Sequence, residues 1–260
     1  MHMTEDAKRI IDDSIRAVLP DAAVYRALEG RRFDRPVTVI AIGKAAWRMA
    51  NAAAKALGEN LREGIVITKY GHSEGDIPRM TIYEAAHPIP DEAGVAATRA
   101  ALALADRMTA QDEVIFLVSG GGSALFEKPL IPPEEMDDIT RQLLACGADI
   151  VEINTLRKRL SAVKGGRFAQ HCAPAKVFSI ILSDILGDPP DMIASGPTCP
   201  DSSTCADAME IVRRYDLSLR EETKQLLMVE TPKALANAQW MITGSVRELC
   251  RAAANACRNL

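Results

Sequence analysis

Apolar residues along this chain fall into two alternating patterns: short continuous runs and longer stretches with helical spacing. The run "VTVIAIG" is typical of a strand buried on both faces, whereas "TEDAKRIIDDSIRAVL" repeats apolar residues every three or four positions. The predicted strands are residues 37–43, 64–69, 80–85, 113–119, 176–184 and 239–244. The predicted helices are 4–19 (stopped by Pro20), 44–58, an alanine-rich stretch that follows the turn at 87–94 and ends near Met108, 132–148, 152–170 (broken at Gly165-Gly166), 204–216 and 245–260.

Strands and helices alternate along the whole chain. Because the strands are continuously apolar, this alternation predicts an α/β fold: a Rossmann-like, mostly parallel sheet with helices on both faces. We expect a single such domain over residues 1–260. Ligands of these folds bind beyond the carboxyl ends of the strands, so the segments that follow the strands are the places to look for chemistry.

Composition narrows the function classes. The chain has 260 residues, 48% hydrophobic and 25% charged, which is ordinary for a globular protein. A net charge of -4 and only 4% aromatic residues argue against a nucleic-acid partner. No apolar run approaches the roughly 18–20 residues that span a bilayer, so we expect no membrane partner. The six cysteines form no C-x-x-C pair, and without a recognisable signal peptide we expect a cytoplasmic protein with reduced thiols.

Three consecutive glycines follow the fourth predicted strand, in Ser119-Gly120-Gly121-Gly122-Ser123. A loop without side chains lets backbone N–H groups bind an anion, and the serine hydroxyls can add hydrogen bonds to phosphate. The spacing is neither that of a Walker A loop nor G-x-G-x-x-G, so a dinucleotide site has weak support. The alternative is a tight strand-to-helix turn that binds nothing.

Basic residues occur at two further places. Lys44 follows the first strand, where its ammonium can neutralise a phosphate or carboxylate; the alternative is a solvated lysine. Arg157 and Lys164 are seven positions apart and would share a helix face, with Lys158 and Arg159 pointing elsewhere. That group can also be an ordinary solvated face. The glycine pair after Lys164 suggests that something approaches the backbone closely there.

Acidic residues gather in the loop after the fifth strand. Asp184, Asp188, Asp191 and Asp201 suit Mg²⁺, which takes one or two carboxylates together with phosphate and water oxygens. Alternatively, they are turn-forming aspartates beside Pro and Gly. His72 and His87 lack the spacing of a metal site, and His87 is equally suited to a substrate hydrogen bond or a structural role.

A glycine anion site, an opposed lysine, basic helix residues and metal-ready aspartates together indicate phosphoryl transfer from a nucleotide–Mg²⁺ complex. Five motifs in order carry a specific resemblance. These are "IGKAAWRMA", "HPIPDEAG", "SGGGSALFEKP", "INTLRKRLSAVKGGRFA" and "LSDILGDPPDMIASGPTCPD". They resemble the class II glycerate 2-kinases, which have a C-terminal MOFRL domain and are often named hydroxypyruvate reductases.

The resemblance implies a kinase that converts D-glycerate and ATP-Mg²⁺ to 2-phosphoglycerate, with its active site in a cleft against the second domain. By the resemblance, Lys44 is a catalytic lysine, and Asn154, Arg157 and Lys164 line the cleft. The segment Ser119–Ser123 holds phosphates. We add Asp184 as a candidate metal ligand and Asp188 as a candidate catalytic acceptor of the hydroxyl proton.

Members of the family run on to roughly 400 residues or more, and this chain ends in a helix that no further strand follows. We therefore expect the C-terminal domain to be missing and kinase activity to be weak or absent. A homodimer is a further possibility that the sequence does not decide. Two other functions stay open: an NAD(P)H-dependent hydroxypyruvate reductase and a nucleotide- or anion-binding module without catalysis.

Overall fold

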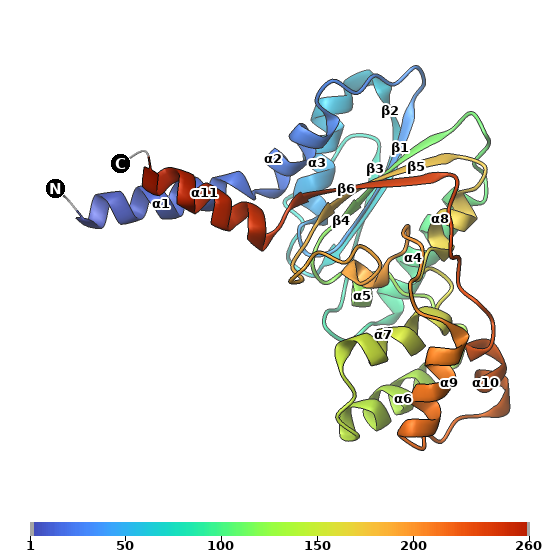
Figure 1. Cartoon of the computed structure of the whole chain (residues 1–260). Helices are drawn as coiled ribbons and strands as arrows, with labels where there is room; N and C mark the ends of the chain where they lie inside the picture. Colours follow the sequence, from blue (N-terminus) through green and yellow to red (C-terminus); the bar gives the residue numbers. More distant parts are fainter. Residues whose placement is uncertain (1–2, 259–260) are drawn as a thin grey trace.

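Six parallel strands form one sheet in the order β3-β2-β1-β4-β5-β6 in the computed structural model, which describes residues 3–258. The order is that of the doubly wound dinucleotide-binding folds, so the predicted Rossmann-like α/β class is confirmed. The strands are β1 (Val37–Ile42), β2 (Leu61–Lys69), β3 (Met80–Ala85), β4 (Glu113–Val118), β5 (Lys176–Leu182) and β6 (Ala238–Gly244). Every residue of β1 is buried, because helices cover both faces of the sheet (Figure 1).

Two hydrophobic cores lie on opposite faces of the sheet. On one face, α4 (Glu92–Ala105) and α8 (Arg167–Cys172) pack Ala101 and Phe168 against Phe116. On the other, α2 (Pro20–Leu28) and α3 (Ala46–Leu57) pack Val24 and Met49 against the sheet. Because successive strand residues point to opposite faces, a strand between two helical layers must be apolar at each position.

A separate helical lobe lies beside the sheet and has its own core (Figure 1). It consists of α6 (Pro133–Ala145), α7 (Ile150–Arg159), α9 (Cys205–Arg214) and α10 (Glu221–Leu227). Ile139, Leu156, Ile211 and Leu227 are buried there. The sequence predicted helices over 132–148 and 204–216 but neither α10 nor the packing of these helices into one unit.

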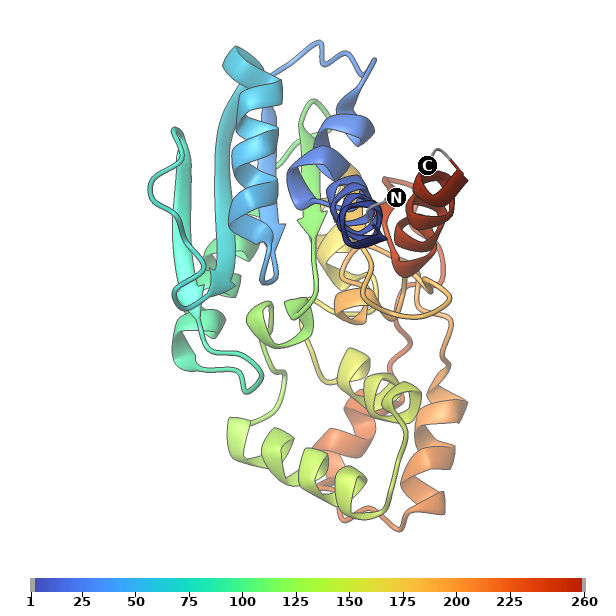
Figure 2. The ribbon, with the colours of Figure 1, turned by 90° about the vertical axis from the view of Figure 1, so that its left-hand side faces the viewer.

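The first and last helices lie side by side (Figure 2) and extend away from the sheet (Figure 1). They are α1 (Met3–Ala17) and α11 (Val246–Arg258). The sequence predicted that the first helix runs to residue 19 and is stopped by Pro20. It ends at Ala17 instead, and Pro20 begins α2, because proline at the first helical position costs no hydrogen bond. None of the helices among residues 3–258 has the length and apolar character to cross a membrane.

The predicted helix over 152–170 is wrong in its middle part. α7 ends at Arg159, and residues 160–166 form an irregular segment before α8 begins. Backbone bonds to an earlier segment replace the helical ones: the amide of Ala162 donates to Lys128 O at 2.9 Å and that of Leu130 to Leu160 O at 2.8 Å. The chain break therefore begins well before Gly165.

Three short helical segments lie between the strands. The four-residue helix α5 (Gly122–Leu125) follows β4, and the 3₁₀ turn η2 (Ile193–Ser195) lies in the long loop after β5. A second 3₁₀ turn, η1 (Gly58–Asn60), joins α3 to β2. The first two matter for the site, because they contact one another at the carboxyl edge of the sheet.

Candidate functional site

The glycine loop, defined here as Ser119–Ser123, lies at the carboxyl end of β4 between the ends of β1 and β5. Since β4 pairs with both strands, the segments that follow them meet at this edge. Lys44 N donates to Gly120 O at 2.9 Å, and Ala45 N donates to the Ser119 hydroxyl at 3.0 Å. The turn after β1 and the glycine loop, which the sequence analysis treated separately, are therefore hydrogen-bonded to one another.

Each of the three central glycines is required by a different neighbour. A Cβ atom at Gly120 would overlap the Asp184 carboxylate. A Cβ at Gly121 would lie 3.0 Å from the His87 ring and 3.2 Å from the Lys44 side chain, and φ there is +87°. A Cβ at Gly122 would lie 2.7 Å from Ala194. The loop is thus the point where Lys44, His87 and Asp184 come together.

Three amides of the loop donate to no acceptor within residues 3–258: those of Gly120, Gly121 and Ser123. Gly122 N donates to Ser119 O at 3.3 Å. Buried or half-buried amides are almost always paired in proteins, with protein, water or a ligand. These unpaired amides, free of side chains at Gly120 and Gly121, are suited to an anion with several oxygens.

Positive charge gathers on one side of the loop. Lys44 is exposed, and His72 Nδ1 lies 2.9 Å from the Lys44 carbonyl. Partial burial, then the charges of Lys44 and Lys69, lower the pKa of His87, and the charge of Asp184 opposes them. His87 is consequently neutral at pH 7 and able to donate or accept one hydrogen bond at each nitrogen. Sequence reasoning missed Lys69, which a strand-end position beside a glycine-rich loop could have suggested.

The two aspartates of the prediction behave differently. Asp184 is exposed and lies against Gly120, while Asp188 has φ of +53° in the loop after β5. Neither side chain forms a hydrogen bond or ion pair with another residue in 3–258. The same residues contain no group of three His, Cys, Asp or Glu side chains arranged for a metal ion. Asp184 is therefore the acidic group that the structure brings to the loop.

Ser123 connects the loop to the segment after β5. Its hydroxyl lies 3.0 Å from the Ser195 hydroxyl, which donates to Asn154 Oδ1 at 3.0 Å. Ser195 is buried and has φ of +60°, and its neighbours Ala194 and Gly196 also have positive φ. Asn154 is thus linked to the loop through Ser195, and it is itself buried rather than facing an open cleft.

Lys164 does not line a cleft, and it does not share a helix face with Arg157. It follows the end of α7, is fully buried, and forms an ion pair with Glu127 at 2.8 Å. Arg157 reaches the same carboxylate from α7 at 3.7 Å and keeps 21% of its side-chain surface exposed. The two cations therefore meet at Glu127, which sequence reasoning missed because a single acid in "FEKP" carries no pattern.

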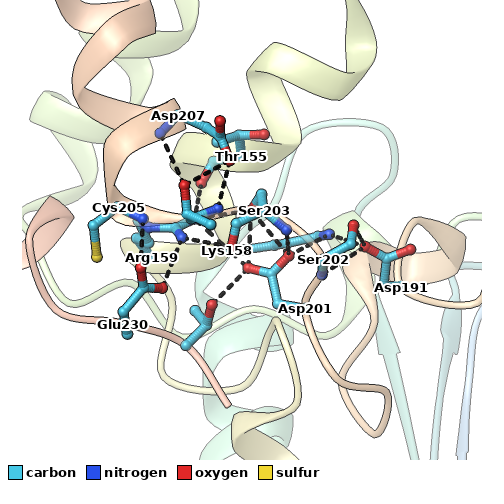
Figure 3. Close-up of polar contacts among 12 residues, drawn as sticks. Thr155, Lys158, Arg159, Asp191, Asp201, Ser202, Ser203, Cys205, Asp207 and Glu230 are labelled. Carbon is cyan, nitrogen blue, oxygen red and sulfur yellow. Dashed lines mark hydrogen bonds and ion pairs between the residues drawn. The ribbon is translucent and has the colours of Figure 1, made fainter. Parts of the chain in front are cut away.

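Lys158, Arg159, Asp191 and Asp201 form a buried network, shown in Figure 3. Lys158 Nζ lies 2.9 Å from Asp191 Oδ2 and 3.0 Å from Asp201 Oδ1, and Arg159 Nη1 lies 3.6 Å from Asp201 Oδ2. Burial would raise the pKa of Asp201, but the Thr231 hydroxyl and the Lys158 charge outweigh it and lower that pKa. Lys158 and Arg159 are therefore not part of a solvated basic face. Asp191 and Asp201 are not free to bind a metal ion, because they neutralise these two buried cations.

The backbone that approaches Gly165-Gly166 belongs to the chain itself. Gly165 N donates to Ser195 O at 3.0 Å and Gly166 N to Gly196 O at 2.7 Å. A Cβ at Gly166 would lie 2.9 Å from Cys199 O. The close approach predicted at the glycine pair is therefore that of the loop after β5.

Comparison with known proteins finds a domain of unknown function, DUF4147, matching residues 6–228. A protein of Thermotoga maritima named D-glycerate 2-kinase is 51% identical over 94% of this chain and 59% of its own length. A crystal structure of a glycerate kinase from T. maritima superposes with a TM-score of 0.94 at 49% identity. The superposition covers 98% of this chain and 62% of the T. maritima chain.

A relative from Agrobacterium vitis is 42% identical over 87% of this chain and 52% of its own, and is named a hydroxypyruvate reductase with a qualifier that marks the activity as unproven. This chain thus spans between about half and three fifths of the length of these curated relatives. The family match itself covers most of the chain and includes β1 to β5 with the glycine loop. The chain therefore belongs to the DUF4147 family.

Proposed function

We propose that this chain carries the phosphate-binding part of a D-glycerate 2-kinase, which transfers the γ-phosphoryl group of ATP to the 2-hydroxyl of D-glycerate. The observation that carries the proposal is the convergence of Lys44, His87 and Asp184 on Gly120 and Gly121, beside three unpaired amides. The name of the T. maritima relative supplies the substrate class.

The residues of the loop fit a polyphosphate. A Cβ at Gly120 or Gly121 would crowd the Asp184 carboxylate or the His87 and Lys44 side chains, so glycine lets these groups lie against the loop. Lys44, as an exposed ammonium against the loop, suits a phosphate as a point charge. Asp184 supplies one carboxylate, which is enough for Mg²⁺ when phosphate and water oxygens complete its shell. A magnesium ion bound there would neutralise charge on the transferring phosphoryl group.

Each residue of the site has a proposed role in the reaction. Lys44 and the loop amides would stabilise charge that grows on the phosphoryl oxygens during in-line attack, and this preorganised stabilisation is the main source of rate. Neutral His87 would orient the glycerate hydroxyl or carboxylate, and partly exposed Arg157 would bind glycerate's carboxylate. Asp188 stays a prediction as the acceptor of the hydroxyl proton.

A single-turnover assay tests the reaction, with the protein in excess over ATP so that weak activity is visible. We expect 2-phosphoglycerate to form only when Mg²⁺, ATP and D-glycerate are all present. Removing one preorganised contact typically costs about 10²–10³ in rate, so Lys44→Met is expected to lose about that factor. Lys55→Met is the matched control, because Lys55 is exposed on α3.

The rival reductase makes an opposite prediction for the same preparation. Oxidation of NADH by hydroxypyruvate without ATP, followed at the nicotinamide absorbance, would overturn the kinase proposal. Tight ADP binding with no turnover in either assay, even in a protein of the relatives' full length, would favour the binding module instead.

A further inference from the structure

A buried ion pair lies directly behind the glycine loop. Lys164 and Glu127 are 0% and 2% exposed at their side chains, and Lys164 Nζ lies 2.8 Å from Glu127 Oε2. Residues of these types are almost never fully buried unless paired. Neither residue touches the exposed side of the loop that the proposed phosphate would occupy, so the proposed reaction leaves the pair without a direct role.

The ammonium of Lys164 also holds the backbone of the short helix that follows the loop. It donates to Ser123 O at 2.8 Å and to Phe126 O at 3.0 Å, at the two ends of one turn. Glu127 in turn accepts from the Ser161 hydroxyl at 2.5 Å. The pair therefore joins three things: the end of the loop, the residue after α5, and the irregular segment after α7.

Ser123 is consequently fixed at two of its three polar groups. Lys164 holds its carbonyl and Ser195 holds its hydroxyl at 3.0 Å. Its amide is one of the three without an acceptor in residues 3–258. A shift of Ser123 would move this amide and, through Ala124 N to Gly121 O at 3.2 Å, the centre of the loop.

Stability alone is a weak reason to keep such a pair. Desolvation of two ions offsets most of their attraction, and well-packed apolar residues often replace buried ion pairs at no cost. Arg157 adds a second cation 3.7 Å from Glu127, which gives a short charge network beside the loop. What apolar residues cannot do is donate to the two carbonyls, since only an N–H or O–H group can.

We infer that Lys164 and Glu127 are positioning residues, which hold Ser123 so that the free amides of the glycine loop stay in the geometry that binds phosphate. The inference rests on the proposed function for what the loop binds. That the pair orders the backbone of α5 does not depend on the proposed function.

The charge of Lys164 gives the device a pH dependence. Burial lowers the pKa of Lys164 to about 8; Glu127 opposes this shift and Arg157 adds to it. These two are the charged groups that face the ammonium, from the residue after α5 and from α7. Above that pH the lysine becomes neutral, and its charge-assisted hydrogen bonds to the two carbonyls weaken. Phosphate affinity is therefore expected to fall as pH rises through about 8.

The test compares Lys164→Met, Glu127→Gln and the double variant, with Lys158→Met as control. Lys158 is also a buried, paired lysine, but its partners are Asp191 and Asp201 rather than the loop. Two readouts are needed: amide hydrogen exchange of Gly122, Ala124, Leu125 and Phe126 without ligand, and the affinity for Mg·ADP. Thermal unfolding reports stability separately.

The double variant separates positioning from stability, because it leaves neither partner as an unpaired charge. We expect it to be less destabilised than Lys164→Met, because no buried ion is left unpaired, yet to exchange the four amides faster than wild type and bind Mg·ADP about tenfold more weakly. Lys158→Met should be destabilised without selective loss of protection in α5. If Lys164→Met does not fold, the double variant carries the test alone.

Recovery of wild-type exchange and wild-type ADP affinity in the double variant would overturn the inference, since the pair would then act through stability only. Equal exchange changes in Lys158→Met and Lys164→Met would overturn it as well. Failure of the wild-type chain to bind Mg·ADP would instead count against the proposed function, and the exchange comparison would still decide the positioning role.

Discussion

Gly43 packs directly on Ser119, so closely that a Cβ atom at residue 43 would overlap the hydroxyl and the carbonyl of Ser119. Gly43 follows β1 and Ser119 follows β4, and the next amide along, Lys44 N, donates to Gly120 O at 2.9 Å. The first βα turn and the glycine loop are thus one structure, and a side chain between them would push them apart.

Gly43→Ala is expected to damage both stability and the site. The residue has φ of +111°, and the new methyl group would meet a backbone carbonyl that cannot move aside. Strain and overpacking together are expected to cost about 2–5 kcal/mol in the free energy of unfolding. Urea denaturation measures this cost. Gly75→Ala is the matched control, because φ is +119° there and nothing lies within 4 Å of the added methyl. Equal losses in the two variants would contradict the close packing.

Gly121→Ala is expected to harm binding more than stability. Its methyl group would crowd the His87 ring and Lys44, which are side chains that can move by a few tenths of an ångström. The unfolding free energy should therefore fall only by the strain of a left-handed residue, about 1 kcal/mol. Mg·ADP binding, measured by calorimetry, should fall about tenfold or more, because the methyl displaces both side chains. Gly30→Ala, with φ of +72° and open space, gives the strain alone. Unchanged affinity in Gly121→Ala would argue against phosphate at this loop.

The sheet was predictable because its strands are buried on both faces. The short, continuous apolar runs of β1 and β4 indicate strands buried on both faces. The alternation of strands and helices along the chain then predicts the parallel arrangement. The place of the site followed, since ligands of these folds bind at the carboxyl edge. Lys44, Ser119–Ser123 and Asp184 all lie there.

The fate of the charged residues was not predictable. Local spacing makes Lys158 look like a solvated helix residue, because its partners Asp191 and Asp201 lie 33 and 43 positions further along the chain. Lys164 was misplaced because α7 stops at Arg159, and that stop depends on backbone bonds to residues 128–130. Tertiary pairing of this kind decides burial, and local spacing does not encode it. The same holds for Glu127, whose partners come from α7 and the segment after it.

Acid is expected to destabilise the protein through Asp191 and Asp201. The folded structure lowers the pKa of both, and ordinary unfolded aspartate titrates near about 3.9. The unfolded chain therefore takes up protons first, and the stabilisation present above about pH 5 is lost as pH falls through the folded values. Urea denaturation between pH 7 and 3 measures the slope. Asp201→Asn should be less stable at pH 7, since Lys158 and Arg159 lose a partner, yet should show a shallower acid slope. A slope as steep as wild type would exclude Asp201 as a source.

The titration of His87 is expected to report whether Lys44 and Asp184 both face the glycine loop. Burial is the largest cause of the lowered pKa of His87, and the charge of Lys44 comes next, while Asp184 acts in the opposite direction. Lys44→Met should therefore raise the pKa of His87 part of the way towards about 6.5, and Asp184→Asn should lower it further. NMR of the imidazole protons follows the titration, with His87→Gln to assign the signal among the four histidines. Lys55→Met, which changes an exposed lysine in the last turn of α3, should leave the pKa of His87 unchanged. Shifts of the same sign in Lys44→Met and Asp184→Asn would mean that one of these side chains points away from His87, and the phosphate-binding geometry built on their convergence would fail with it.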